Sequence, residues 1–184
     1  MPSLPRGDLY IVMEQILIKK AEIMSAASIP LPARLREKLQ QRGAEEKDTL
    51  PEEVGIELLE KSLDAELDPA ELVEHYQVLS ERYHSEAREL LNTGDLVQAS
   101  EKFWGASALA VKRIAATRGL KLEKHGAVWA FVSRLGERND NELILLLHAA
   151  QGLHRNFYEN ELDRKAVEIT AERVELLIEK LGEI

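Results

Sequence analysis

The stretch that decides the fold is residues 94–119, GDLVQASEKFWGASALAVKRIAATRG. Gly94 is typical of the residue that ends a helix, and Asp95 is a strong N-cap for the helix that follows. Apolar residues then recur three and four positions apart as far as Gly119, at Leu96, Ala99, Phe103, Ala106, Ala110 and Ile114. This spacing predicts one long helix with an apolar face, which runs to about Arg118.

Similar signals divide the chain on both sides of this helix. Asp68-Pro69 predicts the start of the preceding helix. A later helix is expected over residues 126–135. Two more are expected to begin at an Asn139–Glu142 capping pair and at Asp163. No segment alternates with period two as a strand would. Small residues predict close approach of the neighbouring helices: Ala99, Gly105, Ala106, Ser107, Ala108 and Ala110. Short connections favour antiparallel neighbours, so residues 69–184 are predicted to form an all-α, up-and-down antiparallel bundle.

Residues 1–68 are predicted to form an extra N-terminal helical region that packs on the bundle or dimerises. Helices are expected from Asp8, over a short segment that stops at Gly43, and from a capping box made by Thr49 and Glu52. Their leucines cannot bury themselves alone. Residues 29–64 also resemble a ribbon-helix-helix unit, although ASIPLP is expected to expose no basic or polar side chain to DNA bases.

Composition limits the class of protein. The 184 residues are 45% hydrophobic and 31% charged, which indicates a soluble globular chain. The sequence has no cysteine, which excludes disulfides and thiolate metal sites, and it has no apolar run long enough to span a membrane. We therefore expect a cytoplasmic protein. The net charge of −9 does not support nucleic-acid or nucleotide binding. Binding of a nucleotide or RNA is kept as an alternative.

Several quoted segments resemble a known superfamily. Residues 80–120 resemble the opening helix pair of HEPN-type domains, residues 124–135 their third helix, and residues 163–181 their last helix. GDLVQASEKFWGASALAVK (94–112) together with LHRNFYE (153–159) is similar to the archaeal PaREP family, a HEPN-like group. The resemblance covers roughly residues 75–182. It implies a HEPN-like helical bundle, often a homodimer, found beside small nucleotidyltransferases.

The resemblance also bears on catalysis. HEPN ribonucleases carry an arginine, often followed by asparagine, and a histidine four to six residues after the arginine. Arg155-Asn156 begins this pattern here, but Asn160, Glu161 and Leu162 stand where the resemblance requires the histidine. The incomplete motif favours a protein that is not an enzyme.

The LHRNFYE cluster (residues 153–159) is the main candidate site. At about 100° per residue, His154 falls on the apolar face of its helix, whereas Arg155, Asn156 and Glu159 are predicted to face away from it. One interpretation is a core histidine that is hydrogen-bonded across the bundle to Glu101 or Ser107. The alternatives are catalysis, or a ligand pocket made by Glu101, Gln151, His154, Arg155, Asn156, Tyr158 and Glu159.

A second candidate site is a run of basic residues. The sequence contains no motif for a metal, cofactor or catalytic site. Lys112, Arg113, Arg118, Lys121 and Lys124 either offset the dipole at a helix C-terminus or contact phosphate or RNA. His148 and His154 are six positions apart, which is a poor spacing for a shared metal. No metal site, catalytic residue or cofactor is predicted.

Three hypotheses follow for the function. The first is a non-catalytic HEPN-like helical interaction or nucleotide-binding module, working as a homodimer or beside a nucleotidyltransferase. The second is an RNA- or nucleotide-processing enzyme that uses the LHRNFYE cluster. The third is a DNA-binding regulator that acts through residues 29–64.

Overall fold

The computed structural model describes residues 29–45, 49–122, 125–138 and 140–184. This part of the chain contains seven α-helices and no strand, which confirms the predicted all-α class. The helices are α2 (Ala33–Glu45), α3 (Pro51–Leu63), α4 (Pro69–Thr93), α5 (Leu96–Ala116), α6 (His125–Arg138), α7 (Glu142–Glu159) and α8 (Arg164–Gly182). The helix predicted from Asp8 lies outside the described residues.

The chain divides into two compact units, residues 1–36 and residues 37–184. The second unit holds the bundle, together with α3 from the predicted N-terminal extension. Leu50 and Val54, at the start of α3, are buried. The domain boundary expected between residues 68 and 69 stays a prediction.

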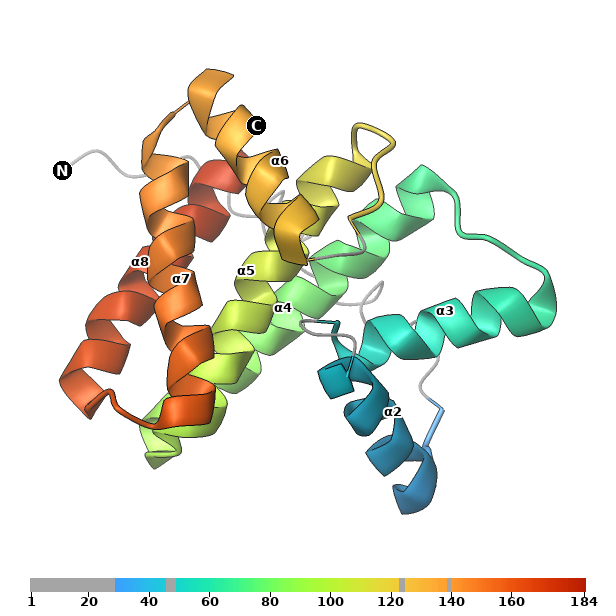
Figure 1. The fold of residues 1–184 in the computed structure, drawn as a ribbon, viewed down its shortest axis with the longest axis horizontal. Helices are drawn as coiled ribbons and strands as arrows, with labels where there is room; N and C mark the ends of the chain where they lie inside the picture. Colours follow the sequence, from blue (N-terminus) through green and yellow to red (C-terminus); the bar gives the residue numbers. More distant parts are fainter. Residues whose placement is uncertain (1–28, 46–48, 123–124, 139) are drawn as a thin grey trace, which may run out of the picture. The chain divides into compact units, whose positions relative to one another are not determined.

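Helix α5 is the centre of the bundle. It lies along α4 and also contacts α6, α7 and α8, and α8 packs in turn on α7 (Figure 1). Because α5 has neighbours on several sides, most of its residues are buried from Ala99 to Ala116. The predicted stripe of small and apolar residues therefore lies on the central, buried helix of the bundle.

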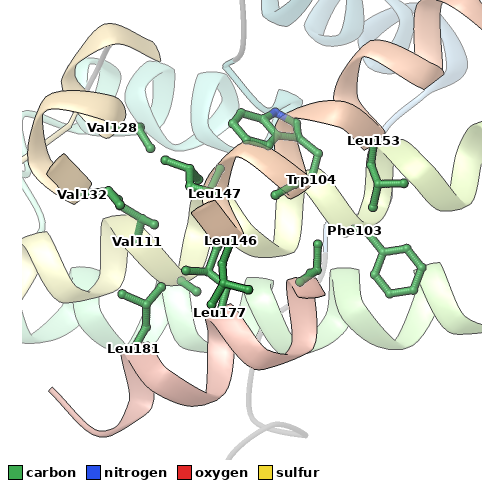
Figure 2. Close-up of a cluster of buried hydrophobic side chains, with 14 of the residues drawn as sticks. Phe103, Trp104, Val111, Val128, Val132, Leu146, Leu147, Leu153, Leu177 and Leu181 are labelled. Atoms are coloured by element: carbon green, nitrogen blue, oxygen red, sulfur yellow. The ribbon is translucent and has the colours of Figure 1, made fainter. Parts of the chain in front are cut away.

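The main core lies where α5 meets α6, α7 and α8, and Ala87 and Leu91 of α4 also contribute to it. Figure 2 shows Phe103, Trp104 and Val111 from α5 together with side chains of α6, α7 and α8: Val128, Val132, Leu146, Leu147, Leu153, Leu177 and Leu181. A second buried cluster lies between α4 and α5 and includes Tyr76, Leu79, Tyr83 and Leu109, together with Leu50. A Cβ atom on Gly105 would lie 2.5 Å from the Tyr83 ring, so this glycine sets the close approach of α4 and α5.

Three of the predicted helix starts are confirmed by their hydrogen bonds. The Asp68 carboxylate accepts from the backbone N–H groups of Ala70 and Glu71 at 2.8 and 2.9 Å. Asp95 accepts from Gln98 N at 3.1 Å, and Asp163 accepts from Ala166 N at 2.8 Å. Gly94 ends α4 with φ of 94°, a left-handed conformation that favours glycine.

The capping box predicted at Thr49 and Glu52 is wrong by one residue. The N-cap of α3 is Leu50, whose backbone N–H donates to Glu53 Oε2 at 3.2 Å. Pro51 explains the shift, because it favours the first helical position and holds the residue before it extended. Helix α2 also continues past Gly43 to Glu45.

The capping pair predicted for α7 also needs correction. Asn139 lies outside the described residues, and it is Asp140 Oδ1 that accepts from Glu142 N at 2.9 Å. The side chain of Asn141, the residue immediately before the helix, makes no capping hydrogen bond.

Candidate functional site

His154 lies inside the bundle, as one of the sequence interpretations predicts. Only 8% of it is exposed, and its Nδ1 atom lies 3.0 Å from Glu101 Oε2 on α5. The imidazole also lies 5.1 Å from the Trp104 ring and 5.2 Å, edge to face, from the Tyr158 ring. Buried polar groups need such partners, so these contacts give His154 a role in joining α7 to α5.

Asn156 is also buried, which corrects the prediction that it faces away from the core. It is 2% exposed, its Nδ2 donates to Ser100 Oγ at 2.9 Å, and its Oδ1 accepts from Leu162 N at 2.7 Å. The α7–α8 connection folds back over this side of α7 and buries a position that the helical wheel places outside. Asn156 therefore binds both α5 and the α7–α8 connection to α7.

Arg155, Tyr158 and Glu159 lie at the surface, and Gln151 is partly buried. Arg155 Nε is 2.9 Å from Glu159 Oε2, and Arg155 Nη2 is 3.7 Å from Glu161. Tyr158 is 67% exposed. Gln151 accepts from Trp129 Nε1 at 3.1 Å, on the side of α7 that meets α6.

These candidate residues do not converge in one pocket. A groove of about 220 Å³ between α7 and α8 is bordered by Arg155, Asn156 and Glu159, but not by the other four: Glu101, Gln151, His154 and Tyr158. His154 thus lies inside the bundle, whereas Arg155 borders the groove. Among the described residues, no three His, Asp or Glu side chains are grouped as metal ligands would be.

The predicted basic run is dispersed by the fold. Lys112 is buried against Glu53, Arg113 Nη2 donates to Leu181 O at 3.3 Å, and Lys121 lies 3.3 Å from Glu60. Arg118 is exposed, 5.6 Å from the centre of the Phe131 ring, and Lys124 lies outside the described residues. The described members therefore do not present one continuous cationic surface.

A cleft beside α3 was not predicted from the sequence. The α3 cleft, of about 960 Å³, is lined by α3, the first half of α4, the end of α5 and the segment after α5. Five acidic and three basic side chains line it, together with His75: Glu53, Glu57, Glu60, Asp64, Glu66, Lys61, Lys112 and Lys121. Contacts such as Lys112–Glu53 join positions 59 residues apart, and no local pattern reveals them.

The charged groups in and beside one end of the cleft form ion pairs and hydrogen bonds with one another. Both carboxylate oxygens of Glu53 accept from Lys112 Nζ, at 2.6 and 2.7 Å. Glu52 lies 2.7 Å from Arg82 and accepts from Tyr83 Oη at 2.7 Å. Burial and the neighbouring Glu52 carboxylate raise the pKa of Tyr83, so its hydroxyl stays protonated and remains a donor.

Replacing His154 by alanine is expected to lower the free energy of unfolding by about 2 kcal/mol, since a hydrogen bond to a charged group and a ring contact are both lost. Arg155→Ala, which removes an exposed ion pair beside it, is expected to cost less than about 1 kcal/mol. Urea unfolding of both variants measures the difference. Equal losses would contradict the division of the cluster into inner and outer residues.

His75 is expected to make stability depend on pH. Burial lowers the pKa of His75 below its ordinary value near 6.5, against the opposing pull of Glu53, Glu52 and Glu60. The unfolded chain therefore takes up the proton at a higher pH than the folded chain does. The contribution of neutral His75 is present above pH 6.5 and is lost as the pH falls through the folded pKa.

Urea unfolding of the wild type and His75→Phe at pH 7.5, 6.5 and 5.5 measures this effect. The stability of the wild type relative to the variant should fall toward pH 5.5, while the other histidines cancel in the difference. A difference that is constant over this range would rule the effect out.

None of the helices in the described part of the chain is long and apolar enough to cross a membrane. The sequence pattern of the archaeal PaREP1/PaREP8 family matches residues 75–178. A crystal structure of a protein from Sulfolobus solfataricus is similar to the chain, with a TM-score of 0.52 and 30% sequence identity, over 57% of this chain and 94% of that one. A comparison with curated proteins gives no match.

The family match begins within α4 and ends within α8, so it includes α5, α6 and α7, which build most of the core. It also includes the LHRNFYE cluster, on which the predicted resemblance partly rested. The structural similarity covers nearly all of the Sulfolobus protein with little more than half of this chain. The chain therefore belongs to the archaeal PaREP1/PaREP8 family.

Proposed function

We propose that this protein is a HEPN-like helical binding module, without catalysis of its own, that works in the cytoplasm through a protein partner. The observation that carries the proposal is the division of the LHRNFYE cluster. His154 and Asn156 hold α7 against α5, whereas Arg155 pairs with Glu159 at the surface. Residues that serve different contacts in this way favour a structural role for the cluster over a reaction centre.

The partner is expected to be a second copy of the chain together with a nucleotidyltransferase, as the HEPN resemblance implies. Cross-linking in the native host, followed by purification of the tagged full-length chain, tests both expectations. Recovery of cross-linked dimers with a nucleotidyltransferase supports the proposal. Recovery of the chain as a monomer without any nucleotidyltransferase would overturn the proposed mode of action.

The enzymatic alternative is tested by incubating the protein with short RNAs and nucleotides. The proposal predicts that cleavage does not differ between the wild type and the His154→Ala and Arg155→Ala variants. An activity that both variants lose would establish the RNA- or nucleotide-processing function instead.

The DNA-binding alternative has one favourable feature, which is the charge of α2. This helix carries four basic and two acidic residues: Arg34, Arg36, Lys38 and Arg42 against Glu37 and Glu45. Helix α3, also in the proposed DNA-binding segment, carries four glutamates against one lysine. Salt-dependent DNA binding that is lost in an Arg34→Ala/Lys38→Ala/Arg42→Ala variant would establish this function.

A further inference from the structure

Helix α3 lies outside the segment of the chain that matches the family. The family match begins at residue 75, after α3 has ended at Leu63. The part of this chain that matches the Sulfolobus protein is 57% of its length, and it accounts for 94% of that solved chain. Little more than half of this chain thus matches almost all of the Sulfolobus protein, and α3 lies outside the segment that matches the family.

Two adjacent acidic residues join the start of α3 to the bundle, and farther along the helix Glu60 lies 3.3 Å from Lys121. Glu52 reaches Arg82 and Tyr83 on α4, and Glu53 reaches Lys112 on α5. Both glutamates lie in the first turn of α3. Glu53 also accepts from the backbone of Leu50, so one carboxylate caps its own helix and binds the neighbouring helix.

The apolar part of the attachment is small and lies at the same end. Leu50 and Val54 are buried, and Leu50 approaches the position of Gly105. Farther along α3, Leu59 is 45% exposed and Leu63 is 70% exposed. The α3 cleft of about 960 Å³ separates this remaining part of α3 from α4 and α5. The buried apolar contacts of α3 are thus at its N-terminal end, whereas Leu59 and Leu63 farther along leave the helix loosely packed.

Lys112 indicates that this face of the bundle favours a carboxylate as its partner. It is 5% exposed, and both carboxylate oxygens of Glu53 accept from its Nζ. A buried ammonium group is costly unless a carboxylate pairs with it. With α3 in place, the buried ammonium group of Lys112 is paired with a carboxylate of that helix, beside the donors Arg82 and Tyr83.

We propose that this face of α4 and α5 is a docking site for an amphipathic helix of a partner protein, one with two adjacent carboxylates in its first turn, and that α3 fills the site in cis. The docking face consists of Tyr76, Arg82, Tyr83, Gly105, Leu109 and Lys112. A competing helix needs an apolar residue beside its carboxylates to replace Leu50. The proposal rests on the proposed function as a binding module and names the partner's recognition element.

A labelled peptide of residues 49–64 is the probe, and the full-length chain is the receptor. The double variant Glu52→Gln/Glu53→Gln weakens the helix in cis but leaves the docking face intact. Because a tethered competitor acts at a high effective concentration, this variant is expected to bind the peptide at least about tenfold more tightly than the wild type does. A control variant, Glu57→Gln/Glu66→Gln, makes the same change of charge away from the face and should bind like the wild type.

Two further comparisons define the chemistry of recognition. A peptide in which both first-turn glutamates are glutamine should lose binding to the opened variant, as should the wild-type peptide when Lys112→Gln is added to that variant. Equal binding of the peptide by the wild type and the folded double variant would overturn the proposal.

Hydrogen exchange of the wild-type chain tests the proposal without any substitution. Excess peptide should speed exchange in α3, because it displaces the helix in cis, and should leave α7 and α8 unchanged. Unchanged exchange in α3 up to the highest soluble peptide concentration would count against a displaceable helix. If these tests fail while cross-linking still captures the nucleotidyltransferase, the proposed function survives and only this docking site is wrong.

Discussion

Gly105→Leu is expected to lower the free energy of unfolding by at least about 3 kcal/mol, which is the upper part of the range for overpacked cores. Even a Cβ atom at this position would lie 2.5 and 2.7 Å from two ring atoms of Tyr83. That ring is 4% exposed, and its hydroxyl is bonded to Glu52, so it cannot move aside without breaking a contact of α3. A leucine must therefore separate α4 from α5.

Alanine at the same position isolates the contact from the effect of helix propensity. Gly105→Ala should destabilise the protein, although alanine favours a helix by about 1 kcal/mol over glycine. Gly152 is the matched control, because it lies within α7 and a Cβ atom there would meet nothing within 4 Å. Gly152→Ala should stabilise the protein by up to about 1 kcal/mol. Urea unfolding that shows the same sign for both alanine variants would contradict this account.

Phe103→Ala is expected to cost about 3–5 kcal/mol of unfolding free energy, the usual range for removing a large buried aromatic side chain. Phe103 is completely buried in the main core (Figure 2). Its ring lies 5.9 Å, edge to face, from that of His84. The cavity that alanine leaves is surrounded by helices that several other contacts hold in place, so it cannot collapse fully.

Phe157→Ala serves as the control for this substitution. Phe157 is only partly buried, at the end of α7, so the same chemical change should cost clearly less there. Chemical unfolding of the two variants side by side gives the comparison. Similar losses would show that the core is not centred on α5.

The elements that could be predicted from the sequence are those that local chemistry determines. Asp68, Asp95 and Asp163 cap their helices through bonds to backbone groups two or three positions away, so a short motif contains all the information. The buried face of α5 follows from spacing within one helix. Gly105 was among the small residues that predicted a close helix approach, and its position against Tyr83 agrees with that prediction.

The contacts that could not be predicted join residues that are far apart in the chain. Asn156 was expected to face away, because a helical wheel cannot show that the α7–α8 connection folds back over it. Its partner Ser100 is 56 positions away. Lys112 was read as part of a basic run, but the fold pairs it with Glu53 from a helix outside the family match. Charge counted along the sequence therefore gave the wrong environment for this lysine.

The measurement that tests the central claim most directly is a double-mutant cycle between His154 and Glu101, followed by urea unfolding. The claim is that the inner part of the LHRNFYE cluster joins α7 to α5, and the 3.0 Å contact between His154 Nδ1 and Glu101 Oε2 is its clearest expression. The account predicts that His154→Ala and Glu101→Ala are not additive, with a coupling energy of about 1 kcal/mol or more. Additive losses, together with an RNA-cleaving activity that either variant abolishes, would contradict it and place a reaction at these residues.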